Sequence, residues 1–125
     1  MPFSLVCDKK ARETYDELRK RAKASVGNRR KSGRTKAFKE EGLFKQVKKC
    51  IQLLKRNPRH PSLETHQYSS IVNPYTPNQK VFEAYAQQNT PAAYRVFWCH
   101  GPQKGEITVL LITNIREDFR PSLSA

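Results

Sequence analysis

Residues 94–113, YRVFWCHGPQKGEITVLLIT, decide the fold that this sequence predicts. They contain two runs rich in aromatic and β-branched residues, 94–99 and 106–113, and this composition is typical of β-strands. The six residues between the runs include two glycines and a proline, which suit a hairpin connection. The sequence therefore predicts two antiparallel strands joined by a short turn.

Three further strands are expected outward from this hairpin. Residues 80–86 have the same aromatic and β-branched character, residues 2–7 form a short apolar start, and residues 61–73 suit a short edge strand. Because successive side chains of a strand point to opposite faces, the strand at 94–99 divides into two sets. Arg95, Phe97 and Cys99 belong to one face, and Val96, Trp98 and His100 to the other.

Two helices are expected before the strands. Apolar residues recur at spacings of three and four on the first, which begins after Asp8 and ends near residues 25–28, and more clearly on the second, which Asn57 and Pro58 close. Their apolar positions are Ala11, Tyr15, Leu18 and Ala22, then Leu43, Phe44, Val47, Cys50, Ile51 and Leu54. The order β-α-α-β-β-β predicts an α+β fold, with two N-terminal helices on one face of an antiparallel sheet and the other face open. At 125 residues, one domain covering 1–125 is expected.

The net positive charge of the chain lies in its N-terminal half. Residues 1–61 contain 19 basic and 6 acidic residues (19 − 6 = +13), whereas residues 62–125 contain 5 of each (5 − 5 = 0). Such an imbalance favours an anionic partner, because basic side chains release counterions when they bind phosphates. Residues 27–37 combine glycines with basic residues and predict a mobile basic loop. The residues expected to bind RNA are Arg29, Arg30, Lys31, Arg34, Lys45, Lys48 and Lys49.

The cysteines and the hydropathy indicate a cytoplasmic protein. Cys7, Cys50 and Cys99 are odd in number and far apart, so they predict neither a disulfide framework nor a thiolate zinc site. No apolar run is long enough to cross a bilayer, and no secretory signal pattern follows the first residues. The sequence indicates no cofactor and no metal site.

Several segments together resemble one protein family. Residues 54–63, LKRNPRHPSL, look like the junction between helix and sheet in RelE/ParE toxins. Residues 80–85, KVFEAY, are similar to the second strand of that family, 94–98, YRVFW, to its Tyr-Arg-Val strand, and 106–112, EITVLLI, to its last strand. The resemblance covers residues 43–119, and it implies the toxin of a type II toxin–antitoxin system.

In the nuclease branch of this family, the resemblance implies a ribosome-dependent mRNA endonuclease that a cognate acidic antitoxin neutralises. Arg95 matches the strand arginine that contacts the scissile phosphate, and Arg116 matches the arginine after the last strand. Two guanidinium groups can stabilise negative charge on the phosphorane through forked hydrogen bonds. Cleavage through the 2′-hydroxyl also requires a base and an acid.

The general acid and base stay open among four residues. The tyrosine or histidine that the family usually carries beyond its last strand is replaced here, and Lys80, Glu83, Tyr85 or His100 could substitute. His60 and His66 are weaker candidates, since a histidine at such a junction usually packs or caps. A structural alternative for Arg95 is an ion pair with Glu83 on the neighbouring strand.

Two other functions remain open from the sequence. A non-catalytic ParE-like toxin that binds DNA gyrase shares the fold and needs no nuclease residues. A basic RNA- or DNA-binding module without nuclease activity would also account for the charge. A small acidic protein encoded beside this one would favour either toxin function over the binding module.

Overall fold

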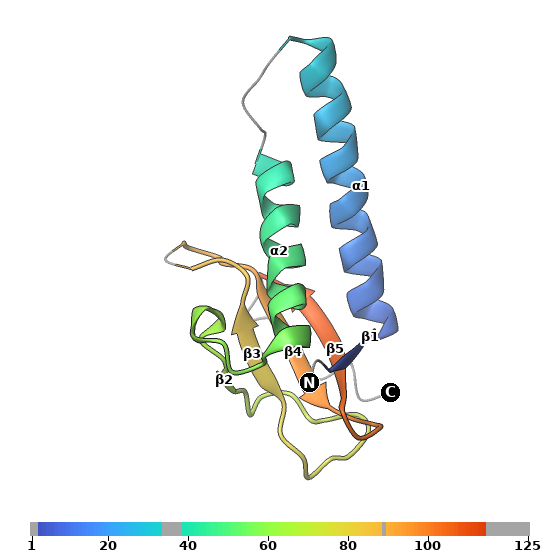
Figure 1. The fold of residues 1–125 in the computed structure, drawn as a ribbon, viewed down its shortest axis with the longest axis vertical. Helices are drawn as coiled ribbons and strands as arrows, with labels where there is room; N and C mark the ends of the chain where they lie inside the picture. Colours follow the sequence, from blue (N-terminus) through green and yellow to red (C-terminus); the bar gives the residue numbers. More distant parts are fainter. Residues whose placement is uncertain (1–2, 34–38, 89, 115–125) are drawn as a thin grey trace.

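The computed structural model describes residues 3–33, 39–88 and 90–114, which form two helices, one 3-10 turn and five strands. Figure 1 shows the two helices side by side over the sheet. In chain order the elements are β1 (Ser4–Cys7), α1 (Lys9–Lys31), α2 (Lys39–Arg56), the 3-10 helix η1 (Pro61–Leu63), β2 (His66–Gln67), β3 (Phe82–Tyr85), β4 (Arg95–His100) and β5 (Glu106–Thr113).

The sheet has the order β1-β5-β4-β3-β2, and all its pairs are antiparallel except β1 with β5. The predicted α+β fold with two helices on one sheet face is confirmed, and β2 lies in the range expected for an edge strand. The parallel pair departs from the fully antiparallel sheet that the sequence suggested. β1 lies beside β5 so that its last residue leads into Asp8, which caps α1 and donates its backbone N–H to the carbonyl of Val109.

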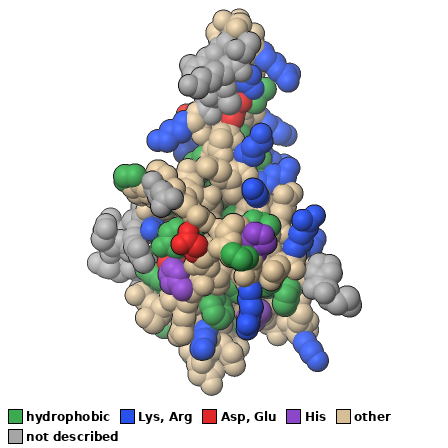
Figure 2. Space-filling model, turned by 60° about the vertical axis from the view of Figure 1, so that its left-hand side comes forward, with side chains coloured by type: hydrophobic (Ala, Val, Ile, Leu, Met, Phe, Trp, Pro, Cys, Tyr) green, Lys and Arg blue, Asp and Glu red, His purple; other side chains and the backbone are tan. Residues whose placement is uncertain are grey.

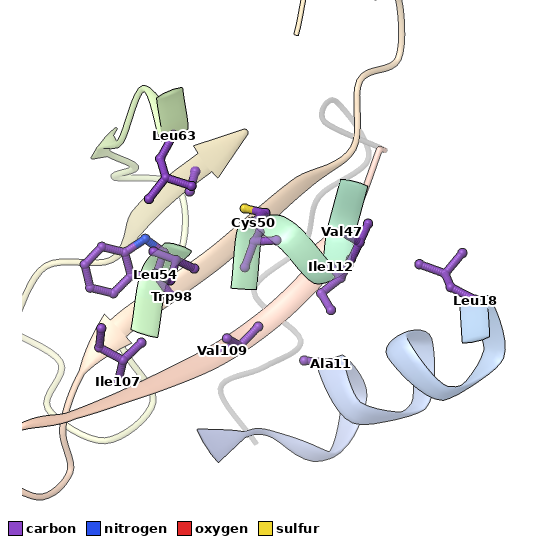
Figure 3. Close-up of a cluster of buried hydrophobic side chains, with 12 residues drawn as sticks. Ala11, Leu18, Val47, Cys50, Leu54, Leu63, Trp98, Ile107, Val109 and Ile112 are labelled. Carbon is purple, nitrogen blue, oxygen red and sulfur yellow. The ribbon is translucent and has the colours of Figure 1, made fainter. Parts of the chain in front are cut away.

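The main core lies between the helices and one face of the sheet. Figure 3 shows side chains from α1, α2, η1 and the strands gathered in one cluster, with Trp98 at one side and Leu18 at the other. Trp98 is 2% exposed, and its ring stacks on Phe82 at a centroid distance of 4.8 Å. The predicted division of β4 is confirmed, because Val96 and Trp98 face the helices while Phe97 and Cys99 belong to a second buried cluster.

The second face of the sheet is partly covered, so the prediction that it is open was wrong. Residues 68–81, here called the crossing segment, run beneath β4 and β5 before they return to β3 (Figure 1). Tyr68 contacts Phe97 with ring centroids 4.8 Å apart, and Ile71 is buried against the same cluster. Tyr75 lies near Asp8 at the far edge, and burial, followed by the negative charge of Asp8, raises the pKa of the Tyr75 hydroxyl. Periodicity cannot reveal such a cover, because residues 68–81 contain no helix or strand of their own.

α1 is longer than the sequence predicted. It continues to Lys31, so the loop expected at residues 27–37 was wrong for residues 27–31, and Arg34 lies outside the described residues. Gly27 lowers helix stability by about 1 kcal/mol relative to alanine. Two features offset that cost: basic residues in the last turn interact favourably with the helix dipole, and Arg29 Nη2 lies 2.8 Å from Glu41 Oε1 on α2.

The two helices extend beyond the sheet as a hairpin (Figure 1). On α1 the buried positions are Ala11, Leu18, Ala22 and Ser25, a narrow stripe on a helix whose other residues are exposed or half-buried. α2 carries the stronger apolar face, with Val47, Cys50 and Leu54 buried. Neither of these helices is long and apolar enough to span a bilayer within the described ranges.

Candidate functional site

Four side chains from three strands gather at one corner of the second sheet face. His66, Glu83, Tyr85 and Arg95 are here called the corner cluster. Register explains the grouping, because β3 pairs His66 with Glu83 across one edge and Tyr85 with Arg95 across the other. Glu83 Oε1 lies 2.7 Å from His66 Nε2, and Glu83 Oε2 lies 3.2 Å from Arg95 Nε. The alternative of an Arg95–Glu83 ion pair is thus what the structure shows.

The contacts of His66 hold its ring between the backbone and the carboxylate of Glu83. Its Nδ1 lies 3.1 Å from the backbone carbonyl oxygen of Glu64, which can only accept a hydrogen bond, so Nδ1 carries a proton. Its Nε2 faces a carboxyl oxygen of Glu83 at 2.7 Å, within ion-pair distance. The ring of His66 is the accessible member, because its side chain is 45% exposed and that of Glu83 is 0% exposed.

Arg95 is buried and incompletely paired. Its side chain is 7% exposed, and its Nε is close to Glu83 without the alignment of a hydrogen bond. Its Nη2 is buried and has no hydrogen-bond partner among the described residues. A buried charged donor without an acceptor is costly, so such groups in proteins usually have a structural or functional explanation. An anionic oxygen is the acceptor that a guanidinium group prefers.

The other predicted catalytic residues do not join the corner cluster. Lys80 is exposed and precedes β3, at the end of that strand away from Tyr85. His100 ends β4 and belongs to the opposite face, where its ring contacts Trp98 at a centroid distance of 5.0 Å. Arg116 lies outside the described residues. The described residues thus bring together Arg95, Glu83 and Tyr85 from the predicted set.

His66 is the member that sequence reasoning undervalued. It was considered weaker than His100, yet it contacts Glu83 directly and its ring lies 5.9 Å from that of Tyr85. The capping role expected of a junction histidine belongs to His60, whose Nδ1 accepts a hydrogen bond from the backbone N–H of Ser62. Only a correct register for the two-residue strand β2 would have identified His66, and two residues give no periodic signal.

The exposed face of α2 is basic and uncompensated. Lys45, Lys48 and Lys49 are exposed and line a groove of about 770 Å³ together with Lys55 and Arg56. None of the three lysines forms an ion pair with another described residue. Figure 2 shows Lys and Arg side chains spread over the helical part of the molecule and few acidic ones on the same side. Arg29 differs from them, because Glu41 neutralises it.

The comparisons with known proteins identify the fold. No protein-family model and no curated protein sequence matches the chain. Among solved structures, a YoeB/ParE toxin from Agrobacterium tumefaciens is similar, with a TM-score of 0.53 over 88% of this chain and 95% of that one. The chain has the RelE/ParE toxin fold. This confirms the fold that the resemblance implied, although the sequence identity is 8% and the likeness therefore concerns the backbone arrangement.

Proposed function

We propose that this RelE/ParE-like protein is the toxin of a type II toxin–antitoxin system and cleaves messenger RNA on the ribosome. The observation that carries the proposal is the buried Nη2 of Arg95, which has no hydrogen-bond partner among the described residues. A phosphate oxygen would supply the missing acceptor and a second negative charge beside the guanidinium group. Because this donor is buried, neighbouring atoms have to move aside when the substrate binds.

The corner cluster contains the groups that such a reaction needs. Arg95 would stabilise charge that develops on the phosphorane, which is the largest single contribution in many active sites. His66, whose Nε2 lies 2.7 Å from Glu83 Oε1, would transfer a proton to or from the reacting oxygen atoms. Tyr85 is half-buried opposite Arg95 and would donate a hydrogen bond to the same phosphate.

Binding to the ribosome would come from the basic face of α2. Lys45, Lys48 and Lys49 point away from the core and have no intramolecular ion pair in the described part of the chain. Cations of this kind bind the phosphate backbone with little dependence on sequence. The same positive charge would attract an acidic antitoxin in the cytoplasm, because complementary charge speeds encounter.

The test separates chemistry from stability at Arg95. Arg95→Lys keeps a positive charge beside Glu83 but lacks the forked geometry, so we expect a melting temperature near that of the wild type. Cleavage of ribosome-bound mRNA, mapped at its 5′ ends in single-turnover reactions, should fall by a factor on the order of 10²–10³. Arg12→Lys, on the exposed surface of α1, is the matched control and should cut normally. A stable Arg95→Lys protein that cuts at the wild-type rate would exclude this active site.

A second candidate is a non-catalytic toxin that inhibits a protein target such as DNA gyrase. The observation in its favour is that His66, Glu83 and Arg95 already contact one another, as a purely structural network would. In that case expression would arrest growth with DNA damage and without new mRNA 5′ ends. The variant Arg95→Lys would then remain as toxic as the wild type.

A further inference from the structure

A pocket of about 650 Å³ lies on the helix-covered side of the sheet, where α2 ends. Its floor is formed by β3 and β4, and its wall by the turn that joins α2 to β2. The lining residues are Phe3, Asn57, Pro58, Arg59, His60, Pro61, Glu64, Thr65, His66, Phe82, Trp98 and His100. The volume falls within the usual range for small-molecule sites. His66 borders both this pocket and the corner cluster, but the floor belongs to the opposite sheet face.

Aromatic rings form the floor of this pocket. The ring of His100 lies 5.0 Å from that of Trp98, 6.0 Å from Phe82 and 5.8 Å from Phe3. Phe3 and Phe82 are half-buried and His100 is exposed, so ring surface remains available to a ligand. Aromatic side chains that present their faces in this way stack on nucleobases.

A rigid turn places a cation at the rim. Asn57 Oδ1 accepts a hydrogen bond from the backbone N–H of Arg59, and the backbone carbonyl of Asn57 accepts one from His60. The backbone carbonyl oxygen of Pro58, a buried residue, accepts a hydrogen bond from the hydroxyl group of Thr65. The backbone of Arg59 is therefore fixed before a ligand arrives, which lowers the entropic cost of binding.

The charge at this rim is positive and incompletely neutralised. Arg59 forms no ion pair with another described residue. Burial, and then the positive charge of Arg59, lower the pKa of His100. Glu64 is the one carboxylate among the described residues that line the pocket, whereas one arginine and three histidines line it as well. An anion placed between Arg59 and His100 would relieve their mutual repulsion.

We propose that this pocket binds a nucleotide, with its base on the rings of Phe3 and Phe82 and its phosphate between Arg59 and His100. The aromatic floor alone would accept a nucleoside, and the cations alone would accept inorganic phosphate. Their juxtaposition in one pocket of this size favours the molecule that carries both groups. The site is separate from the phosphate contact proposed for Arg95, and it requires no cleavage activity.

The test uses the purified full chain and the fluorescence of Trp98, the single tryptophan of the sequence, which contacts the ring of His100. Adenosine 5′-monophosphate should change this fluorescence saturably, with at least tenfold higher affinity than adenosine or inorganic phosphate. Arg59→Gln should weaken the nucleotide roughly tenfold, because a charge-assisted hydrogen bond is lost. Lys104→Gln removes the same charge from the exposed turn before β5 and should leave the affinity unchanged.

The protonation of His100 provides an independent readout by nuclear magnetic resonance. A bound phosphate should raise the pKa of His100, which burial and Arg59 lower in the free protein. The proposal is overturned if inorganic phosphate binds as tightly as the nucleotide, or if Lys104→Gln weakens binding as much as Arg59→Gln. The second result would mean that the nucleotide responds only to the overall charge of the chain. Intact thermal unfolding of each variant confirms that the pocket is still formed.

Discussion

The projecting helical hairpin and the corner cluster use charge in opposite ways. On the hairpin, most basic side chains stand in solvent apart from Arg29, and an exposed pair such as Arg21–Glu17 has side chains 60% and 56% exposed. In the corner cluster, the side chains of Arg95 and Glu83 are 7% and 0% exposed. Exposed pairs contribute little to stability, whereas removing one partner of a buried pair is strongly destabilising. The many exposed charges of the hairpin therefore provide attraction over a distance, whereas the few buried charges of the corner cluster hold their side chains in a defined geometry.

The largest expected effect is a loss of stability at the corner cluster. Arg95→Ala removes the cation beside the buried carboxylate of Glu83 and should cost about 3 kcal/mol or more. Arg21→Ala, the matched change on the hairpin, should cost less than about 1 kcal/mol. Urea unfolding at neutral pH measures both values. Equal costs for the two variants would contradict the distinction between the regions.

The next effect concerns two buried thiols, that of Cys50 on α2 and that of Cys99 on β4. Burial raises the pKa of Cys50 to about 12, and burial, with a smaller contribution from Asp8, raises that of Cys99 to about 11. In the unfolded chain the pKa of a cysteine thiol is near 9, so both thiols ionise more readily there. The free energy of unfolding should therefore fall as the pH rises from about 9 toward 12. Each thiol contributes a slope of up to about 1.4 kcal/mol per pH unit. Unfolding measured from pH 8 to 10.5 checks this.

Cys50→Ala supplies the control for that pH dependence. The variant should be less stable at pH 8, because a buried side chain is lost, but its stability should decline less steeply above pH 9. An unchanged slope would show that another group accounts for the alkaline loss.

A smaller effect is expected on the exposed face of α2. Replacing Lys45, Lys48 and Lys49 by serine would remove three of the phosphate contacts that we propose. The salt dependence of the proposed ribosome binding, on a double-logarithmic plot, should then fall by roughly 2–3 units. The melting temperature should change little, since these side chains are exposed. Co-sedimentation at several salt concentrations measures the slope. If replacing Arg29, which Glu41 neutralises, reduces this slope as much as replacing one of these lysines, the distinction between paired and unpaired cations fails.

The smallest expected effect is a gain in stability on the hairpin. A side chain added at Gly27 would meet no atom within 4 Å, and the residue lies inside α1. Gly27→Ala should therefore stabilise the protein by up to about 1 kcal/mol. The same change at Gly33, where φ is +72°, should destabilise it. Thermal unfolding of both variants would reveal whether α1 extends through residue 27 in solution.

Local patterns in the sequence were sufficient for most elements and for part of the site. The run at 94–99 and the apolar face of the second helix correspond to β4 and α2, because strand and helix periods leave a clear imprint when one face is buried. Arg95, Glu83 and Tyr85 were found through the family resemblance. The end of α1 was missed because Gly27 and its basic neighbours resemble a loop, and only the contact of Arg29 with Glu41 on α2 shows otherwise.

The sequence by itself determined the α+β class, the placement of positive charge in the N-terminal half and the alternation along β4. Tertiary structure decided which charges are neutralised and which sheet face is covered. It brought His66 to Glu83 through a two-residue strand, and it laid the crossing segment over Phe97 and Cys99. The physical reason is that these features depend on contacts between residues distant in the chain. Such contacts follow from register and packing, which no local period encodes.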